Sequence, residues 1–499
     1  MSKNNADIQV VSSGSKISKN LTEGNVFSVL IKFSLPYLLS CFLQTFYGLA
    51  DIFIIGQFYG ATSISAVSSG SQLMHMFTVM LAGFAMGVTV SIGRCVGEKD
   101  NKKLSCVIGN SILIFSIIAA FSTIVLIIFA NPILHLIFTP EEAFSETYKY
   151  VIICFAGLPF ITAYNLLSSI FRGLGNTKSP MYFVLFAGVF NIILDFIFIG
   201  GFHWGAAGAA SATIISQALS VIFALFSLRK MTSDFGRREN IAGGGNISHS
   251  ENIAGGGNPS GAKKTFGELA LSKSDFSFNT SIISHMLKIG LPIAIQEGLI
   301  QVSFMVITAI ANSRGVQVAA AVGIVEKIIC FLFLVPSAML SSVSAISSQN
   351  AGAQQHMRAQ RTLFYAVLIC IGFGAVVFTV CQFWAERILQ FFSSNEPQVI
   401  ILGAGYLRAY TLDCIFAGVH FCFSGFFCAY GKSFYSFIHN ILSIVIFRIP
   451  GALLASIKFP QTLYPMGLAA PIGSFFSIIV CLFLFYKMVN RQTFFDKVI

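Results

Sequence analysis

The stretch SLPYLLSCFLQTFYGLADIFIIGQ, residues 34–57, decides the fold class. It is apolar over more than the roughly 20 residues that a helix needs to cross about 30 Å of hydrocarbon. Gln44, Gly48 and Asp51 interrupt it at positions i, i+4 and i+7, which places all three on one helical face. The alternating pattern of a membrane β-strand is not present in this stretch. It therefore predicts a membrane-spanning α-helix with one polar stripe.

The composition extends this prediction to the whole chain. Of its 499 residues, 55% are apolar and only 10% are charged, against about a quarter charged in soluble domains. Twelve apolar segments are long enough to span a bilayer, near residues 28–56, 64–92, 104–130, 147–171, 180–201, 205–228, 283–311, 316–347, 362–385, 400–428, 434–457 and 466–488. We therefore expect an all-α, polytopic membrane protein and exclude an ordinary soluble enzyme.

The basic residues predict the orientation of these spans. Most of the 31 Lys and Arg residues fall in segments that share one side of the membrane. The segments between spans 1 and 2, 3 and 4, and 5 and 6 carry one basic residue, Lys149. Because Lys and Arg resist translocation, we expect a multi-pass protein of the cytoplasmic (inner) membrane with both termini in the cytoplasm. This asymmetry accounts for the net charge of +11 without a nucleic-acid partner.

A segment rich in Gly, Ser and Asn divides the spans into six and six. It contains the sequence ENIAGGGN twice, and such a composition cannot bury a core, so we expect a flexible tether. The expected organisation is an N-terminal tail (1–26), an N-lobe with spans 1 to 6 (27–229), a linker (230–282), a C-lobe with spans 7 to 12 (283–488) and a C-terminal tail (489–499).

The two halves share landmarks at a nearly constant separation. The matching pairs are Pro36 and Pro292, Gly97 and Gly352, Gly175 and Gly431, Asn191 and Asn440, and Gly208 and Gly467. Because each half has an even number of spans, both enter the membrane in the same direction. We therefore expect two six-helix lobes related by a pseudo-two-fold axis along the membrane normal, as in transporters. Pro36 and Pro292 each remove a helical hydrogen bond and are expected to bend spans 1 and 7.

Ionisable residues inside the spans are few, and each marks a candidate site because a charge in hydrocarbon is unfavourable. Asp51 lies in span 1, and Asn191 and Asp195 lie at i and i+4 in span 5, without a Lys or Arg nearby in spans 1, 5 or 6. We expect the two carboxylates to hold a proton or a metal cation such as Na⁺. Thr213 and Gln217 are four apart in span 6. Hydrogen bonding between helices is an alternative role for Asn191, Thr213 and Gln217.

Other polar residues of the spans are candidates for a substrate cavity. They are Gln44, Tyr47, Gln217, Glu297, Gln301 and Asp413. These side chains either bind a cationic substrate or only hydrate a central cleft. We expect Arg408, five residues before Asp413, to neutralise that carboxylate. The sequence holds no Walker P-loop and no motif of a metalloprotease or serine hydrolase, so we expect neither enzymatic activity nor a cofactor beyond a coupling ion.

An ordered set of motifs resembles the multidrug and toxic compound extrusion (MATE) family of antiporters. The set begins with residues 34–57 and continues with RGLGNTKSPM (172–181), NIILDFIFIGG (191–201) and GAAGAASATIISQ (205–217). The resemblance covers all twelve spans. It implies a monomer with a V-shaped central cavity in the lipid bilayer, which exports organic cations in exchange for H⁺ or Na⁺.

The resemblance to the DinF-like branch of that family also implies a set of coupling residues. In that branch an Asp of helix 1, an Asn and an Asp of helix 5 and a Thr of helix 6 form a site in the N-lobe. Asp51, Asn191, Asp195 and Thr213 match those positions. Other branches carry an acidic pair in helices 7 and 10, to which Glu297 and Asp413 are only loosely similar.

Three other functions are compatible with a polytopic chain. A lipid-linked precursor flippase of the same superfamily would have a more basic cavity and often fourteen spans. A passive channel is disfavoured by the two-lobed repeat, since channels usually build pores from symmetric subunits. A major facilitator transporter shares the six plus six spans, but its basic signature between spans 2 and 3 is not evident in GRCVGEKDNKKL (93–104).

Overall fold

A computed structural model describes residues 20–137, 139–242, 273–392 and 396–490, and all regular elements within these ranges are helices. Eleven helical segments are long and apolar enough to cross a membrane. The helices α5 (Glu141–Ala156) and α6 (Leu158–Gly173) form a pair bent by 49° that supplies a twelfth span. The predicted all-helical membrane fold is thereby confirmed, with the fourth span broken at Gly157.

The other helices of the first half follow the predicted spans closely. They are α1 (Val26–Phe58), α2 (Ala61–Glu98), α3 (Asn101–Ile128), α4 (Ala130–Leu136), α7 (Lys178–Asp195), the π-helical turn η1 (Phe196–Gly201) and α8 (Gly205–Ala242). The helix α4 is a short addition at the end of the third span.

The second half repeats this order. Its elements are η2 (Lys273–Phe276), α9 (Thr280–Asn312), α10 (Val316–Leu332), α11 (Leu334–Gly352), α12 (His356–Phe392), α13 (Pro397–Tyr410), α14 (Asp413–Ala429), α15 (Ser433–Leu442), the π-helical turn η3 (Ser443–Arg448), α16 (Ile449–Lys458), α17 (Tyr464–Gly467) and α18 (Ala469–Asn490). The two π-helical turns, η1 and η3, interrupt the corresponding spans of the two halves shortly after the matching Asn191 and Asn440.

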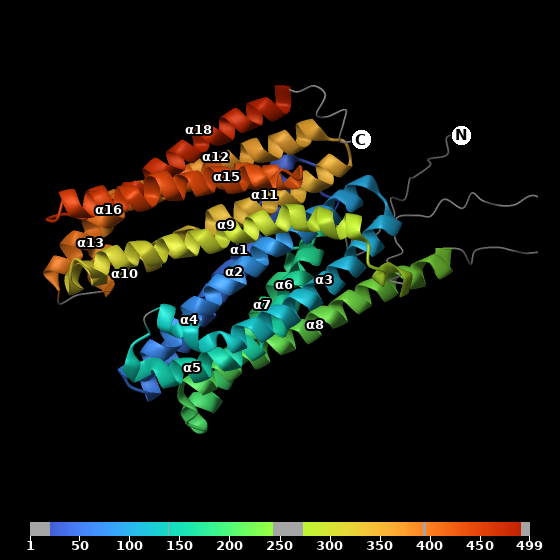
Figure 1. Ribbon diagram of the computed structural model, residues 1–499. Coiled ribbons are helices and arrows are strands. Elements are labelled where there is room, and N and C mark those ends of the chain that lie inside the picture. The colour runs from blue at the N-terminus through green and yellow to red at the C-terminus, as the bar shows by residue number, and fades with distance from the viewer. Residues whose placement is uncertain (1–19, 138, 243–272, 393–395, 491–499) are drawn as a thin grey trace, which may run out of the picture.

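The two halves form two bundles that are joined at one end (Figure 1). At the other end they diverge, with α4 and α5 on one bundle and α10, α13 and α16 on the other. The C-terminal ends of α8 and α18 both point toward the joined end. The arrangement is a V of helices.

Glycines allow the bundles to approach closely at the joined end. A Cβ added to Gly97 of α2 would lie 2.0 Å from the Gln349 carbonyl oxygen of α11. A Cβ added to the matching Gly352 would lie 2.2 Å from the Arg94 carbonyl oxygen of α2. Gly87 and Gly290 make the same kind of contact between α2 and α9. The reciprocal contact of Gly97 and Gly352 places the pseudo-two-fold axis between α2 and α11.

The predicted prolines lie inside α1 and α9, and a hydroxyl group from a later helix start binds a backbone carbonyl near each of them. Pro292 cannot donate to the Lys288 carbonyl one turn earlier, and the Ser433 Oγ donates to that oxygen instead at 2.8 Å. In the first half, Thr177 Oγ1 donates to the Phe33 carbonyl at 2.8 Å, within the turn before Pro36. In each half, this hydrogen bond ties the proline-containing helix (α1 or α9) to the start of the helix that follows the matching glycine, Gly175 or Gly431.

The segments expected to be flexible are partly packed where they are described. Helix α8 continues into the predicted linker as far as Ala242. At the other end of the linker, the Asn279 amide donates to Asn110 Oδ1 of α3 at 2.8 Å. In the N-terminal tail, the Leu21 amide donates to Gln349 Oε1, and Arg358 donates to the Gly24 carbonyl. The expectations for residues 1–19, 243–272 and 491–499 lie outside the described residues.

We predict that Gly97→Ala destabilises the protein. The added methyl group would overlap a backbone oxygen of α11, and overpacking of this kind costs about 1–3 kcal/mol. Thermal unfolding of the purified protein in detergent should show a melting temperature several degrees lower. Gly372→Ala in α12 is the matched control, since nothing lies within 4 Å of its added Cβ. Equal melting temperatures for the two variants would contradict the proposed contact.

Candidate functional site

The structure brings together the four residues expected to form a coupling site. Asp51 of α1 and Asp195 of α7 are 4% and 0% exposed, and their carboxyl groups lie within electrostatic range of each other. Thr213 Oγ1 of α8 donates to Asp51 Oδ2 at 3.2 Å. Asn191 Nδ2 lies 3.5 Å from Thr213 Oγ1. Helix α1 thus meets the consecutive helices α7 and α8, which lie far along the chain from it, at one polar cluster. We call it the N-lobe cluster (Asp51, Asn191, Asp195 and Thr213).

The N-lobe cluster is rich in acceptors that have no donor. In the described part of the chain, five buried oxygens here lack a hydrogen bond: Asp51 Oδ1, Asn191 Oδ1, Asp195 Oδ1, Asp195 Oδ2 and Gln217 Oε1. Leaving a buried acceptor unsatisfied is unfavourable by about 1–3 kcal/mol. Two ionised carboxylates in contact also repel each other. A proton shared by the carboxyl groups, or a cation with oxygen ligands, would relieve both penalties.

Tyr47 and Gln217 lie next to the N-lobe cluster. Tyr47 OH of α1 accepts a hydrogen bond from Gln217 Nε2 of α8 at 3.1 Å. Gly188 of α7 provides space for the tyrosine, because its added Cβ would lie 3.4 Å from the Tyr47 ring. The pair therefore links the two helices that carry Asp51 and Thr213, and it leaves Gln217 Oε1 available as an acceptor.

Sequence reasoning missed a tyrosine beside the carboxylates. Tyr150 of α5 is 3% exposed and lies within electrostatic range of both Asp51 and Asp195. Gly70 of α2 makes room for it, since an added Cβ would lie 2.3 Å from the ring. Tyr150 stands in a different span from both aspartates, so no local spacing could have identified it.

The backbone also marks this site. The π-helical turn η1 begins at Phe196, directly after Asp195. The turn forms the end of the fifth span, which stops at Gly201. Here the turn changes the helical register immediately beyond the second carboxylate.

The remaining cavity candidates do not join the N-lobe cluster. Gln44, Glu297 and Gln301 are half-buried, and among the described residues they form no hydrogen bond with it. Asp413 is buried at the first turn of α14, near Ser474 of α18. The C-lobe acids Glu297 and Asp413 therefore do not reproduce the arrangement of Asp51 and Asp195.

The expected neutralisation of Asp413 by Arg408 is wrong. Arg408 Nη2 forms an ion pair with Glu386 Oε1 of α12 at 3.1 Å. Helix α13 ends at Tyr410 and α14 begins at Asp413. This break changes the direction in which the two side chains point, so a spacing of five residues along one helix does not apply.

The second half has polar contacts that the sequence did not predict. Arg448 Nη2 donates to Tyr410 OH at 2.8 Å, and its guanidinium lies 4.2 Å from the centre of the Phe304 ring. The buried rings of His420 and His439 lie 5.3 Å apart. These residues come from α9, α13, α14, α15 and η3. The two halves therefore have similar helix arrangements but different polar clusters.

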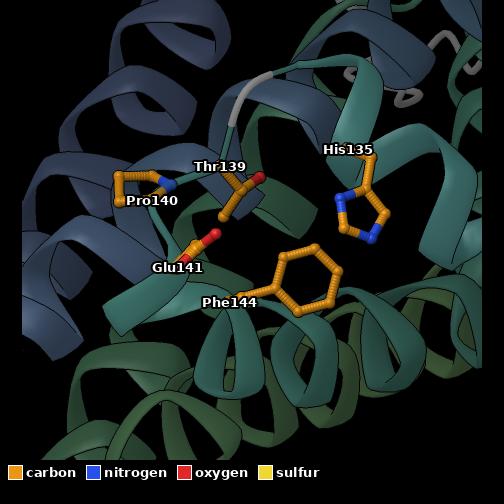
Figure 2. A pocket seen from close by; sticks show the side chains of 5 residues that line it. All are labelled: His135, Thr139, Pro140, Glu141 and Phe144. Atoms are coloured by element: carbon orange, nitrogen blue, oxygen red, sulfur yellow. The ribbon is translucent and has the colours of Figure 1, made fainter.

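A surface pocket of about 580 Å³ lies between α4 and α5, away from these clusters. His135, Thr139, Pro140, Glu141 and Phe144 line it, and the His135 ring lies beside the Phe144 ring in Figure 2. It contains none of the residues expected to bind an ion or a substrate.

The chain is similar to known proteins over most of its length. The chain matches the MatE family over residues 36–197 and 292–454, one match in each half, which begin at Pro36 and Pro292. It is 26% identical to the probable multidrug resistance protein YpnP of Bacillus subtilis, over 94% of this chain and 96% of that protein. It is 25% identical to the multidrug export protein MepA of Staphylococcus haemolyticus, over 94% and 96%.

A solved structure shows the same fold. The crystal structure of a MATE protein in complex with MaL6 superposes with a TM-score of 0.81 at 20% identity, covering 97% of this chain and 100% of that one. The family match spans more than half of the chain and both of its repeats. The chain belongs to the MatE family of multidrug efflux transporters, which are membrane proteins and not enzymes.

Proposed function

We propose that this protein is a secondary active exporter that moves organic cations out of the cell in exchange for H⁺ or Na⁺. The observation that carries the proposal is the N-lobe cluster, in which four buried acceptor oxygens lack a donor, three of them on the carboxyl groups of Asp51 and Asp195 and one on Asn191. Among the described residues, neither carboxylate forms an ion pair with Lys or Arg. Such a site is suited to exchange one positive species for another.

Competition for the carboxylates couples the two fluxes. When Asp51 and Asp195 hold no proton or Na⁺, their charge attracts a cationic substrate. When H⁺ or Na⁺ binds, the charge is cancelled and the substrate leaves. The ion can drive the cycle only because it binds the two conformations of the transporter with different affinity.

We further propose that the chain belongs to the DinF-like branch of the family, which carries the same four residue types in helices 1, 5 and 6. Both termini are cytoplasmic in this proposal, as the Lys and Arg distribution favours. The diverging ends of the two bundles then face the outside. The protein works as a monomer, and its two lobes move as units about the joined end.

We predict that Asp51→Asn abolishes energised efflux. The substitution keeps the size of the side chain but removes the charge that H⁺ or Na⁺ must cancel. In inside-out vesicles with an acidified or Na⁺-loaded lumen, uptake of a fluorescent organic cation should fall by about tenfold or more, since coupling free energies of 1–3 kcal/mol are typical.

Glu142→Gln is the matched control for this experiment, because Glu142 is an exposed acid at the start of α5. It should transport as the unmodified protein does. A thermal melt should show that Asp51→Asn remains folded. Gradient-driven export by a folded Asp51→Asn protein would refute the coupling role of the N-lobe cluster.

We predict that Thr213 distinguishes the two coupling ions. Thr213→Val removes a hydroxyl oxygen that touches Asp51 but leaves both carboxylates in place. A Na⁺-coupled transporter should need about tenfold more Na⁺ for half-maximal export, because it loses one oxygen ligand. An H⁺-coupled transporter should keep its dependence on the proton gradient, and Thr213→Ser should resemble the unmodified protein in either case.

A further inference from the structure

A pocket lies between α9 and α15, outside the N-lobe cluster. Its volume is about 470 Å³. The lining combines two basic side chains, Lys288 and Lys432, with the apolar side chains of Leu291 and Phe434. No acidic residue in the described part of the chain lines it.

The fold builds this pocket from the proline of α9. Because Pro292 leaves the Lys288 carbonyl without its helical donor, Ser433 Oγ binds that oxygen at 2.8 Å and ties α15 to α9. Gly431 just before α15 has φ +69°, a left-handed turn that favours glycine. The turn and the hydrogen bond place Lys432 at the same pocket as Lys288.

The apolar side chains of the pocket lie on the outer surface of the protein. Leu291 and Phe434 are 49% and 58% exposed, in spans where exposed apolar side chains contact lipid. Lys288 precedes Leu291 by about one helical turn, toward the start of α9 and the linker. The pocket therefore places positive charge next to an apolar surface. A phospholipid has the matching arrangement, with its phosphate next to its acyl chains.

We propose that this pocket binds one anionic phospholipid. The phosphate lies between the ammonium groups of Lys288 and Lys432, and an acyl chain lies along Leu291 and Phe434. Basic pockets between membrane helices are suited to anionic headgroups. A free phosphate ion could bind beside the lysines, but it would leave the exposed apolar lining uncovered. The lipid bridges α9 and α15 beside Pro292 of α9, and its binding is independent of the ion coupling proposed above.

Lipid titration followed by native mass spectrometry tests the proposal on the purified full chain. The probes are phosphatidylglycerol and phosphatidylcholine with identical acyl chains. Phosphatidylglycerol should bind more tightly, and the variant Lys288→Gln/Lys432→Gln should lower its affinity by about tenfold, since each lysine near an anionic lipid contributes measurably. The affinity for phosphatidylcholine should not change.

The charge-matched control is Lys99→Gln/Lys102→Gln, which removes two exposed lysines from the connection between α2 and α3. It should bind phosphatidylglycerol as the unmodified protein does. If the double variant of the pocket melts early, Lys288→Gln alone should still lower the affinity by about fivefold, because this side chain is exposed.

Two results would overturn the proposal. One is an unchanged affinity for phosphatidylglycerol in folded Lys288→Gln and Lys288→Gln/Lys432→Gln proteins. The other is displacement of phosphatidylglycerol by millimolar inorganic phosphate, which would show that the pocket takes a small anion and not a lipid.

Discussion

The close approach of α2 to α9 and α11 is the contact on which the architecture depends. Lipid tails are as apolar as leucine, so helices in a membrane associate through tight packing and not through a hydrophobic driving force. Gly87, Gly97, Gly290 and Gly352 allow backbone to touch backbone across the seam between the two halves. The joined end is therefore held by main-chain contact, while the remainder of each bundle is free to specialise.

That specialisation is visible in how the two halves use one backbone plan. Both contain a first helix with an internal proline, a hydroxyl group that binds a backbone carbonyl in the turn before that proline, and a π-helical turn in the fifth span. In the first half, this backbone carries Asp51 and Asp195 close to each other. In the second half, the corresponding backbone carries Arg448, which donates a hydrogen bond to Tyr410. The repeated backbone gives both halves the same helix arrangement, and the polar side chains that differ between them give each half its own chemistry.

Much of the fold could be predicted because lipid leaves few choices. A long apolar run must be helical, so the spans and the two halves followed from hydropathy and from landmarks such as Pro36 and Pro292. Asp51 was identifiable because it stands on a polar stripe of a single helix. Its pairing with Asp195 joins distant spans. The lack of a Lys or Arg near either carboxylate suggested this pairing, and the resemblance to a known family supported it.

Other features could not be read from the chain because they arise only when helices pack. Tyr150 packs against Gly70 and lies within electrostatic range of the carboxylates. Arg408 turns to Glu386 because a helix ends between it and Asp413.

The V shape has a mechanical consequence. Helix α2 has 38 residues, so it is about 57 Å long. With the glycine seam as a fulcrum at one end, a tilt of about 10° would sweep the opposite tip through roughly 10 Å by simple geometry, a long lever driven by a small displacement at its pivot.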